Sequence, residues 1–125
     1  MVLGLGTDFL EISRVERELM RGEWLTEDGI FTPEEIRRCS SAGKPARCFA
    51  ACFAAKEAAL KALGVKVNDL AMFQEVELAP ALNGGFKIVL RNRLESEAGR
   101  LGVRQIHLSI SDDDARAGAV VILED

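Results

Sequence analysis

The sequence predicts an α+β domain in which an antiparallel sheet packs around a long central helix. Residues 45–63 are rich in alanine and leucine and apolar nearly all round, which indicates a buried helix. Residues 106–111 alternate apolar and polar side chains, and residues 117–123 form a continuous apolar run; both patterns are typical of strands. Asn83-Gly84, a favoured pair for a tight hairpin turn, joins two further apolar segments. Helices combined with hairpin-connected strands indicate the α+β class.

The chain opens with a strand and a short helix. Residues 2–7 form an apolar, glycine-spaced run, which predicts a buried strand that ends at a turn. Ser13 and Glu16 have the spacing of a capping box, in which each side chain binds the other residue's backbone amide. We therefore expect a helix over residues 13–21.

Two further helices follow. Thr32, Pro33 and Glu35 supply an N-cap, a first-turn proline and a capping-box acid, which predicts a helix that ends at Gly43. The central helix over residues 45–63 is then closed by the glycine that follows it.

The second half of the chain predicts most of the sheet. Strands over residues 72–79 and 85–90 form the hairpin, and a short polar helix over 91–101 leads to the last two strands. Because residues 117–123 carry no polar side chain, we expect a central strand that is buried on both faces.

Composition excludes several classes of protein. At 125 residues, the chain is predicted to be one domain over residues 1–125. Its net charge of −4 argues against non-specific nucleic-acid binding, for which a basic domain is expected. The longest apolar run, about seven residues, is far shorter than the roughly 20 that a membrane helix needs. Asp8 comes too early for a signal peptide, so we expect a cytoplasmic protein with no membrane segment.

The chain has three cysteines, Cys39, Cys48 and Cys52. An odd number without an export signal favours reduced thiols over a disulfide framework. The only histidine, His107, is far away in the sequence, which argues against a zinc site. His107 lies on the polar face of its strand, and we expect a structural, hydrogen-bonding role for it.

The central helix carries three charged residues, Lys56, Glu57 and Lys61, in its apolar second half. Charged groups on a buried helix must be paired, solvated or bound to an ion. Glu57 and Lys61 lie one turn apart, so one interpretation is an ion pair on a solvated edge. Asp8, which follows the glycine-spaced strand, can in the same way simply form a turn or cap a helix.

The alternative interpretation is a shared site. Two neighbouring carboxylates repel each other, so a site formed by Asp8 and Glu57 calls for a cation. Such an oxygen-only pair suits Mg²⁺, which typically takes one or two carboxylates together with substrate phosphates and water. Lys61 would then neutralise a phosphate. This interpretation predicts phosphate chemistry on a metal, provided that the fold brings Asp8 to Glu57.

A stripe of arginines lies on the first predicted helix. Arg14, Arg17 and Arg21 are spaced i, i+3 and i+7 in a chain that is acidic overall. Glu16 and Glu18 flank them, so a solvated helix face is one interpretation. The other is a docking surface for an acidic recognition helix of a partner, which would raise the association rate and make it sensitive to salt.

Three motifs resemble the holo-acyl-carrier-protein synthase family, the small 4′-phosphopantetheinyl transferases. They are the opening GLGTDFLEISRV, the helix FAAKEAALKALG and the strand IHLSIS. The helix is close to the most specific signature of the family, and the resemblance covers essentially the whole chain. It implies the 4′-phosphopantetheinyl transferase fold and a homotrimer with sites at the subunit interfaces.

The resemblance also implies a reaction. In this family, a serine hydroxyl of apo acyl carrier protein attacks the β-phosphorus of coenzyme A, takes up 4′-phosphopantetheine and releases adenosine 3′,5′-bisphosphate. At the matching positions, Asp8 and Glu57 would hold Mg²⁺, Lys61 would contact the pyrophosphate and Arg14 would contact the carrier protein. Further expected contacts to coenzyme A are made by Gly64, Lys66 and Ser109.

The chain departs from the family pattern at several positions. Cys52 stands where the family has an arginine, and Asp112 stands where it has a histidine. Asp112 can replace that histidine as a catalytic base, attract a second cation or remain a solvated loop acid. Lys66 belongs to a Val-Lys pair that replaces the family's Thr-Gly, and it either restores a charge near the nucleotide or is solvated. The glycine-rich hairpin turn lacks the family's proline.

These departures leave alternatives open. The leading hypothesis is Mg²⁺-dependent transfer of phosphopantetheine from coenzyme A to a carrier protein, in lipid metabolism. A second hypothesis is a degenerate relative that binds coenzyme A or a carrier protein without turnover, and the substitutions at Cys52 and Asp112 favour it. A third is a specialised transferase with a divergent carrier partner. Retention of Asp8, Glu57 and Lys61 favours an enzyme.

Overall fold

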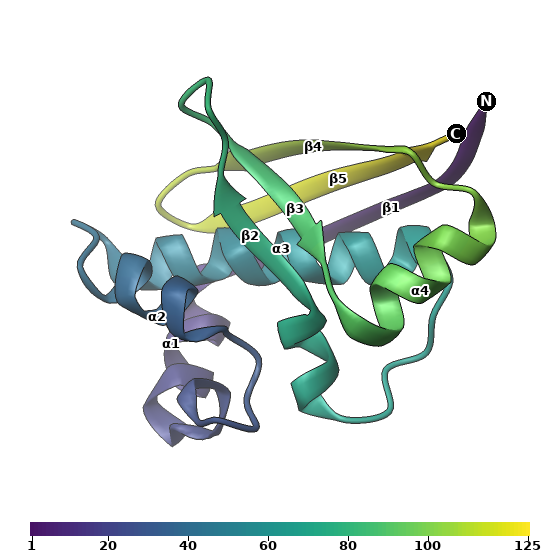
Figure 1. The fold of residues 1–125 in the computed structure, drawn as a ribbon. Coiled ribbons are helices and arrows are strands. Elements are labelled where there is room, and N and C mark those ends of the chain that lie inside the picture. The colour runs from purple at the N-terminus through teal and green to yellow at the C-terminus, as the bar shows by residue number, and fades with distance from the viewer.

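The computed structural model describes all 125 residues, which form two antiparallel sheets around one long helix (Figure 1). The strands are β1 (Val2–Glu11), β2 (Val76–Pro80), β3 (Phe86–Leu90), β4 (Gln105–Asp112) and β5 (Arg116–Glu124). The α-helices are α1 (Ile12–Arg21), α2 (Pro33–Ser40), α3 (Pro45–Leu63) and α4 (Asn92–Leu101). Short 3₁₀ helices span Glu23–Leu25 and Leu70–Glu75. The α+β prediction is confirmed.

The larger sheet has the strand order β1-β5-β4, all antiparallel, and β5 is central as predicted. Its burial alternates along the strand, because only one face of the sheet packs against α3. On the other face, which we call the outer face, the Val120 side chain is 37% exposed. The expectation of a strand buried on both faces is therefore wrong, since no second layer covers this sheet within the chain.

Helix α3 has the predicted bounds, and Gly64 ends it with a left-handed φ of 70°. Strand β1 crosses this helix at very short range. A Cβ atom added to Gly6 would lie 1.9 Å from the carbonyl oxygen of Ala58, and one added to Gly4 would lie 2.1 Å from that of Ala62. Only glycine permits such an approach, so the glycine spacing of the first strand serves to bring two backbones together.

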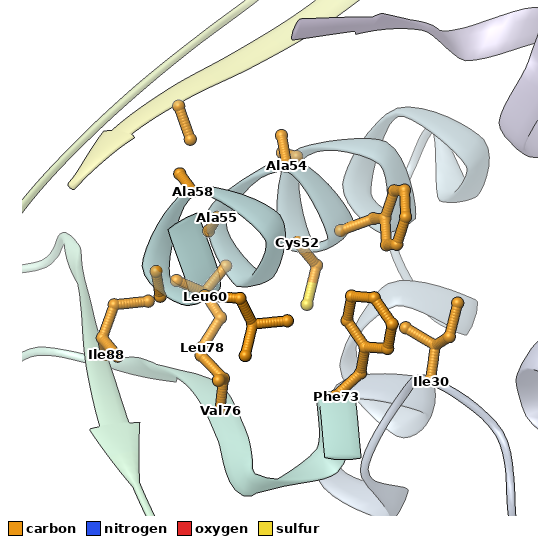
Figure 2. Close-up of a cluster of buried hydrophobic side chains, with 14 of the residues drawn as sticks. Ile30, Cys52, Ala54, Ala55, Ala58, Leu60, Phe73, Val76, Leu78 and Ile88 are labelled. Carbon is orange, nitrogen blue, oxygen red and sulfur yellow. The ribbon is translucent and has the colours of Figure 1, made fainter. Parts of the chain in front are cut away.

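The two faces of α3 carry side chains of different size. Ala58 lies on the side that faces the larger sheet. Cys52 and Leu60 point the other way, toward the 3₁₀ helix and the hairpin, which contribute Phe73 and Leu78 (Figure 2). Small side chains let the sheet approach the helix, and larger ones fill the wider gap to the hairpin.

Helix starts follow local rules only in part. The Thr32–Glu35 capping box of α2 is present, although the helix ends at Ser40 and not at Gly43. The predicted capping box of α1 is wrong: α1 begins at Ile12, and its N-cap Glu11 makes no side-chain cap bond. Strand β1 runs directly into α1, and the Ile12 amide binds the carbonyl oxygen of Ala115 in the loop before β5. A tertiary contact thus replaces the cap.

The hairpin β2–β3 is present, and its turn contains the predicted Asn83-Gly84 pair. Five residues, 81–85, connect the strands, and Gly84 adopts a positive φ of 91°. The first part of the predicted strand over 72–79 is instead the 3₁₀ helix Leu70–Glu75, which Asp69 caps through the Met72 amide.

A buried ion pair joins α2 to α3. Lys56 Nζ lies 2.7 Å from Glu35 Oε1, and both side chains are fully buried. Lys56 also donates to the carbonyl oxygens of Phe73 and Val76, and Glu35 also accepts from the Leu78 amide. The pair is therefore fully hydrogen-bonded and structural, as a buried charge requires.

The expectation of three reduced thiols is wrong for two of them. Cys39, at the end of α2, and Cys48, in the first turn of α3, form a disulfide with a Cα–Cα distance of 5.3 Å. The packing of α2 on α3 creates this proximity, and no sequence spacing shows it. Cys52 remains free and is fully buried, and burial raises the pKa of its thiol well above the ordinary value.

No helix of the structure is long and apolar enough to span a membrane.

Candidate metal and phosphate site

The crossing of β1 over α3 brings Asp8 to the second half of the helix. Lys61 Nζ donates to Asp8 Oδ1 at 3.2 Å and to the Thr7 carbonyl oxygen at 3.0 Å. The Asp8 side chain is 16% exposed and that of Lys61 is 53% exposed. The ion pair of Lys61 is thus made across the two elements to Asp8, and no pair between Glu57 and Lys61 forms along the helix.

Glu57 lies one turn before Lys61 and belongs to the same cluster. Partial burial raises the pKa of Glu57, and the nearby negative charge of Asp8 raises it further. Lys61 and Arg14 oppose this shift through their positive charges. Asp8 therefore lies near enough for its charge to act on Glu57, as the metal interpretation requires. We call Asp8, Glu57 and Lys61 the carboxylate–lysine cluster.

The donor set of this cluster fits a magnesium ion. Two carboxylates in mutual repulsion, one with a raised pKa, would be relieved by a divalent cation. Nowhere in the structure do three or more metal-ligating side chains gather. An ion held here would thus take two ligands from the protein and the rest from substrate and water, as Mg²⁺ does when it binds with phosphates.

A shallow hollow of about 580 Å³ over β1, β5 and the end of β4 includes Asp8 in its lining, and Phe9 and Arg116 line it as well. Asp8, Ser109 and Asp112 all contribute to its lining. The carboxylate of Asp112 is not free, because Arg47 Nη2 lies 2.8 Å from its Oδ1 and Arg47 Nε lies 3.1 Å from the same atom. Sequence reasoning did not identify Arg47, because only the fold brings it to Asp112.

The remaining expected contacts to coenzyme A lie away from the hollow. Gly64 ends α3, and Lys66, two residues later, has an exposed side chain with no ion pair or hydrogen bond.

His107 binds Glu124, with 3.1 Å between Nε2 and Oε1, so its predicted hydrogen-bonding role is confirmed. Cys52 faces the interior, so no cation stands on the surface at that position.

The three arginines of the stripe on α1 differ in their ion pairs. Arg21 binds Glu18 on its own helix, with 3.0 Å between Nη1 and Oε1. Arg14 and Arg17 make no ion pair and line a second hollow of about 610 Å³, together with Phe9 and Arg116. Sequence reasoning missed Phe9 and Arg116, because β1 extends to Glu11, past the predicted end of the strand at residue 7.

Comparisons with known proteins show the family of the chain. The family model of the 4′-phosphopantetheinyl transferase superfamily matches residues 4–120. The holo-(acyl-carrier-protein) synthase of Geobacter sp. (strain M21) is 39% identical over 124 residues, which cover 99% of each chain. That of Moorella thermoacetica is 38% identical over 123 residues, covering 98% of this chain and 94% of the relative.

Solved structures agree as well. The crystal structure of holo-(acyl-carrier-protein) synthase from Neisseria meningitidis superposes with a TM-score of 0.87 at 30% identity and full coverage of both chains. The complex of the Chronobacterium ammoniagenes synthase with CoA superposes with a TM-score of 0.80 at 28% identity, covering 97% of this chain and 96% of the other. From its motifs, its carboxylate–lysine cluster and these matches, the chain belongs to the 4′-phosphopantetheinyl transferase superfamily.

Proposed function

We propose that this protein transfers 4′-phosphopantetheine from coenzyme A to a serine of apo acyl carrier protein in a Mg²⁺-dependent reaction. The observation that carries the proposal is the carboxylate–lysine cluster, assembled across β1 and α3 in a chain of this superfamily. The serine oxygen bonds to the β-phosphorus as the pyrophosphate bridge breaks, and adenosine 3′,5′-bisphosphate leaves. Positioning and electrostatic stabilisation supply most of the catalysis in such reactions.

Each member of the cluster has a distinct part. Asp8 and Glu57 would hold Mg²⁺, which would supply positive charge to the pyrophosphate. The ammonium group of Lys61 has three donors, of which two bind Asp8 and the Thr7 carbonyl oxygen. The third can donate to a phosphate oxygen, and the exposure of Lys61 leaves it accessible.

Contacts to coenzyme A and to the serine proton complete the proposal. Ser109 lies in the hollow beside Asp8, and Gly64 and Lys66 lie beyond the end of α3. Asp112 shares the hollow with Asp8 and is the proposed base for the serine proton, held in orientation by Arg47. The relative from Chronobacterium ammoniagenes forms a complex with CoA, which supports coenzyme A as the donor.

We also propose a homotrimer with sites at the subunit interfaces. The outer face carries apolar side chains that nothing in the chain covers, among them Leu3, Leu5 and Val120. Burial of such a face against further copies would be favourable. By family resemblance we assign the reaction to fatty acid biosynthesis in the cytoplasm.

A second candidate function is carrier or coenzyme A binding without turnover. The pairing of Asp112 with Arg47 favours it, because the carboxylate in the family's histidine position is already engaged. The buried Cys52 favours it too, because that position offers no cation to a phosphate.

A mass-spectrometric assay separates the two functions. The protein is incubated with coenzyme A, Mg²⁺ and apo carrier protein, and Glu57→Ala serves as the control. A gain of one phosphopantetheine mass that is lost in the control supports the transferase. No gain, with coenzyme A or carrier binding retained by calorimetry, supports the binding protein. If the protein shows no mass gain and no binding, the result contradicts both functions.

A further inference from the structure

The hollow between α1 and the start of β5 gathers positive charges that have no ion-pair partner within the protein. Arg14, Arg17 and Arg116 line it, and none of their side chains makes an ion pair or hydrogen bond. Most other arginines pair with acids: Arg21, Arg37, Arg47, Arg91, Arg93 and Arg100. In a chain with a net charge of −4, three unneutralised guanidinium groups in one hollow indicate an acidic partner.

Phe9, on the outer face of β1, is the aromatic residue in the lining of this hollow. Phe9 pairs with Gly118 on β5, and a Cβ atom at Gly118 would lie 3.0 Å from Phe9 Cδ2. The glycine therefore gives the aromatic ring room to lie across β5. The Arg116 guanidinium lies 5.8 Å from the centre of that ring, within cation–π range. The Phe9 ring thus lies beside Arg116, and both line the hollow together with residues of α1.

The Phe9 ring is itself part of the surface, because its side chain is 70% exposed. The hollow thus combines an apolar centre with three positive charges. Glu11, the only acid in its lining, is the register partner of Arg116 but forms no ion pair with it. A partner that fits would present an apolar side chain between carboxylates.

The hollow adjoins the carboxylate–lysine cluster. Arg14 lines the hollow and is also close enough to Glu57 to lower the pKa of that carboxyl group. A partner bound over Phe9 therefore lies next to the proposed phosphate site, where an acceptor hydroxyl has to be.

We propose that Phe9 and Arg116 complete, with Arg14 and Arg17, the surface that recognises an acidic helix of the carrier protein. This inference rests on the proposed function and assigns specificity to two residues outside α1. Arg21 is paired with Glu18, so Arg116 supplies the third unpaired guanidinium group beside Arg14 and Arg17. Charge supplies steering and orientation, and the Phe9 ring supplies a desolvated contact.

The test compares Arg116→Glu and Phe9→Ala with Arg104→Glu. Arg104 is a matched control, because its side chain is exposed, makes no ion pair or hydrogen bond and lies outside the hollow. We expect Arg116→Glu and Phe9→Ala to raise KM for apo carrier protein by roughly tenfold. Both residues also line the hollow beside Asp8, so coenzyme A binding is measured in the same variants, and a loss of coenzyme A binding as large as the loss of carrier binding would overturn the inference. For Arg104→Glu we expect no change in either. The salt dependence of kcat/KM should decrease in Arg116→Glu only.

Calorimetry of apo carrier binding, without turnover, keeps this inference separate from the proposed function. If the unmodified protein transfers nothing but binds the carrier, and Arg116→Glu weakens that binding, the proposed function fails and the recognition surface stands. If transfer occurs and Arg116→Glu matches Arg104→Glu, the recognition surface is wrong. A changed molecular mass of Arg116→Glu in light scattering would instead assign Arg116 to a contact between subunits and would overturn the inference.

Discussion

Two neighbouring charged residues on α3 serve different purposes because their surroundings differ. Lys56 points into the core, where Glu35 and two carbonyl oxygens surround it. Glu57, the next residue, is half-buried, and the charge of another acid, Asp8, raises its pKa. The first arrangement is complete within the protein. In the second, Lys61 binds Asp8 but Glu57 forms no ion pair, which is why this arrangement is the candidate for a ligand.

Removal of the Asp8 charge is expected to lower the pKa of Glu57. Burial raises this pKa first and repulsion by Asp8 raises it second, so Asp8→Asn removes the second cause. Carboxyl NMR titration of the metal-free protein measures the shift, and Lys61→Met should move the pKa in the opposite direction. An unchanged pKa in Asp8→Asn would contradict the shared site.

The same pKa makes a prediction for the metal. Only the ionised form of Glu57 can bind Mg²⁺, and a raised pKa means that protonation begins at a higher pH than for an ordinary carboxyl group. The affinity for Mg²⁺ in the presence of coenzyme A should therefore fall as the pH is lowered through that range. Calorimetry at a series of pH values measures it.

Lys56→Met is expected to lower the free energy of unfolding by about 3–5 kcal/mol, because it leaves Glu35 as a buried, unpaired charge. Denaturation by urea measures the change. Lys87→Met is the matched control, because Lys87 is exposed and unpaired, and its effect should stay within about 0.5 kcal/mol. A loss below about 1 kcal/mol for Lys56→Met would mean that the pair is not needed.

At the scale of elements, the site depends on one contact between two backbones. Strand β1 lies directly against α3 because its glycines face alanines of the helix. Asp8, two residues after the second of these glycines, is therefore held close to α3. The same strand continues into α1 without a loop and so places Arg14 beside the cluster. A single strand therefore sets the position of both the acidic and the basic part of the site.

Gly6→Ala is expected to cost about 3 kcal/mol of stability and to abolish transfer, because the new methyl group would overlap the Ala58 carbonyl oxygen. Gly99→Ala, in α4, is the matched control. Nothing lies within 4 Å of a Cβ atom there, so the substitution should stabilise the helix by up to about 1 kcal/mol. Urea denaturation of both variants decides the matter, and equal stabilities would rule out the close crossing.

Arg14→Glu tests the basic part of the site. Transfer to carrier protein should be lost while coenzyme A binding persists, because the variant reverses one charge of the docking surface and leaves Asp8 and Lys61 in place. Transfer is measured by mass spectrometry and coenzyme A binding by calorimetry. Equal loss of both would assign Arg14 to the coenzyme A site instead.

At the scale of the whole molecule, the uncovered outer face predicts association. The protein should have a mass of roughly three times 13.6 kDa in light scattering. Leu5→Asp, on the outer face, should reduce this mass and the transfer activity, because it places a charge in an apolar contact. Leu82→Asp, in the exposed hairpin turn, should change neither. A monomeric unmodified protein would contradict the trimer.

Much of this architecture could be predicted where local rules act alone. The bounds of α3 follow from its composition and from the glycine after it, and the start of α2 follows from Thr32 and Glu35. The predictions were wrong where contacts between segments far apart in the sequence decide the local structure. Strand β1 replaces the expected cap of α1, and the contact of α2 with α3 joins Cys39 to Cys48.

The candidate site shows the same division. The sequence by itself determined the acidic and basic residues of the cluster, their spacing on the helix and the family resemblance, because these are properties of the order of residues. Only the tertiary structure decided that Lys61 pairs with Asp8, that Arg47 holds Asp112 and that Arg116 joins the arginines of α1. The physical reason is that charges interact through space, so the partner of each is decided by which backbones the core packing brings together.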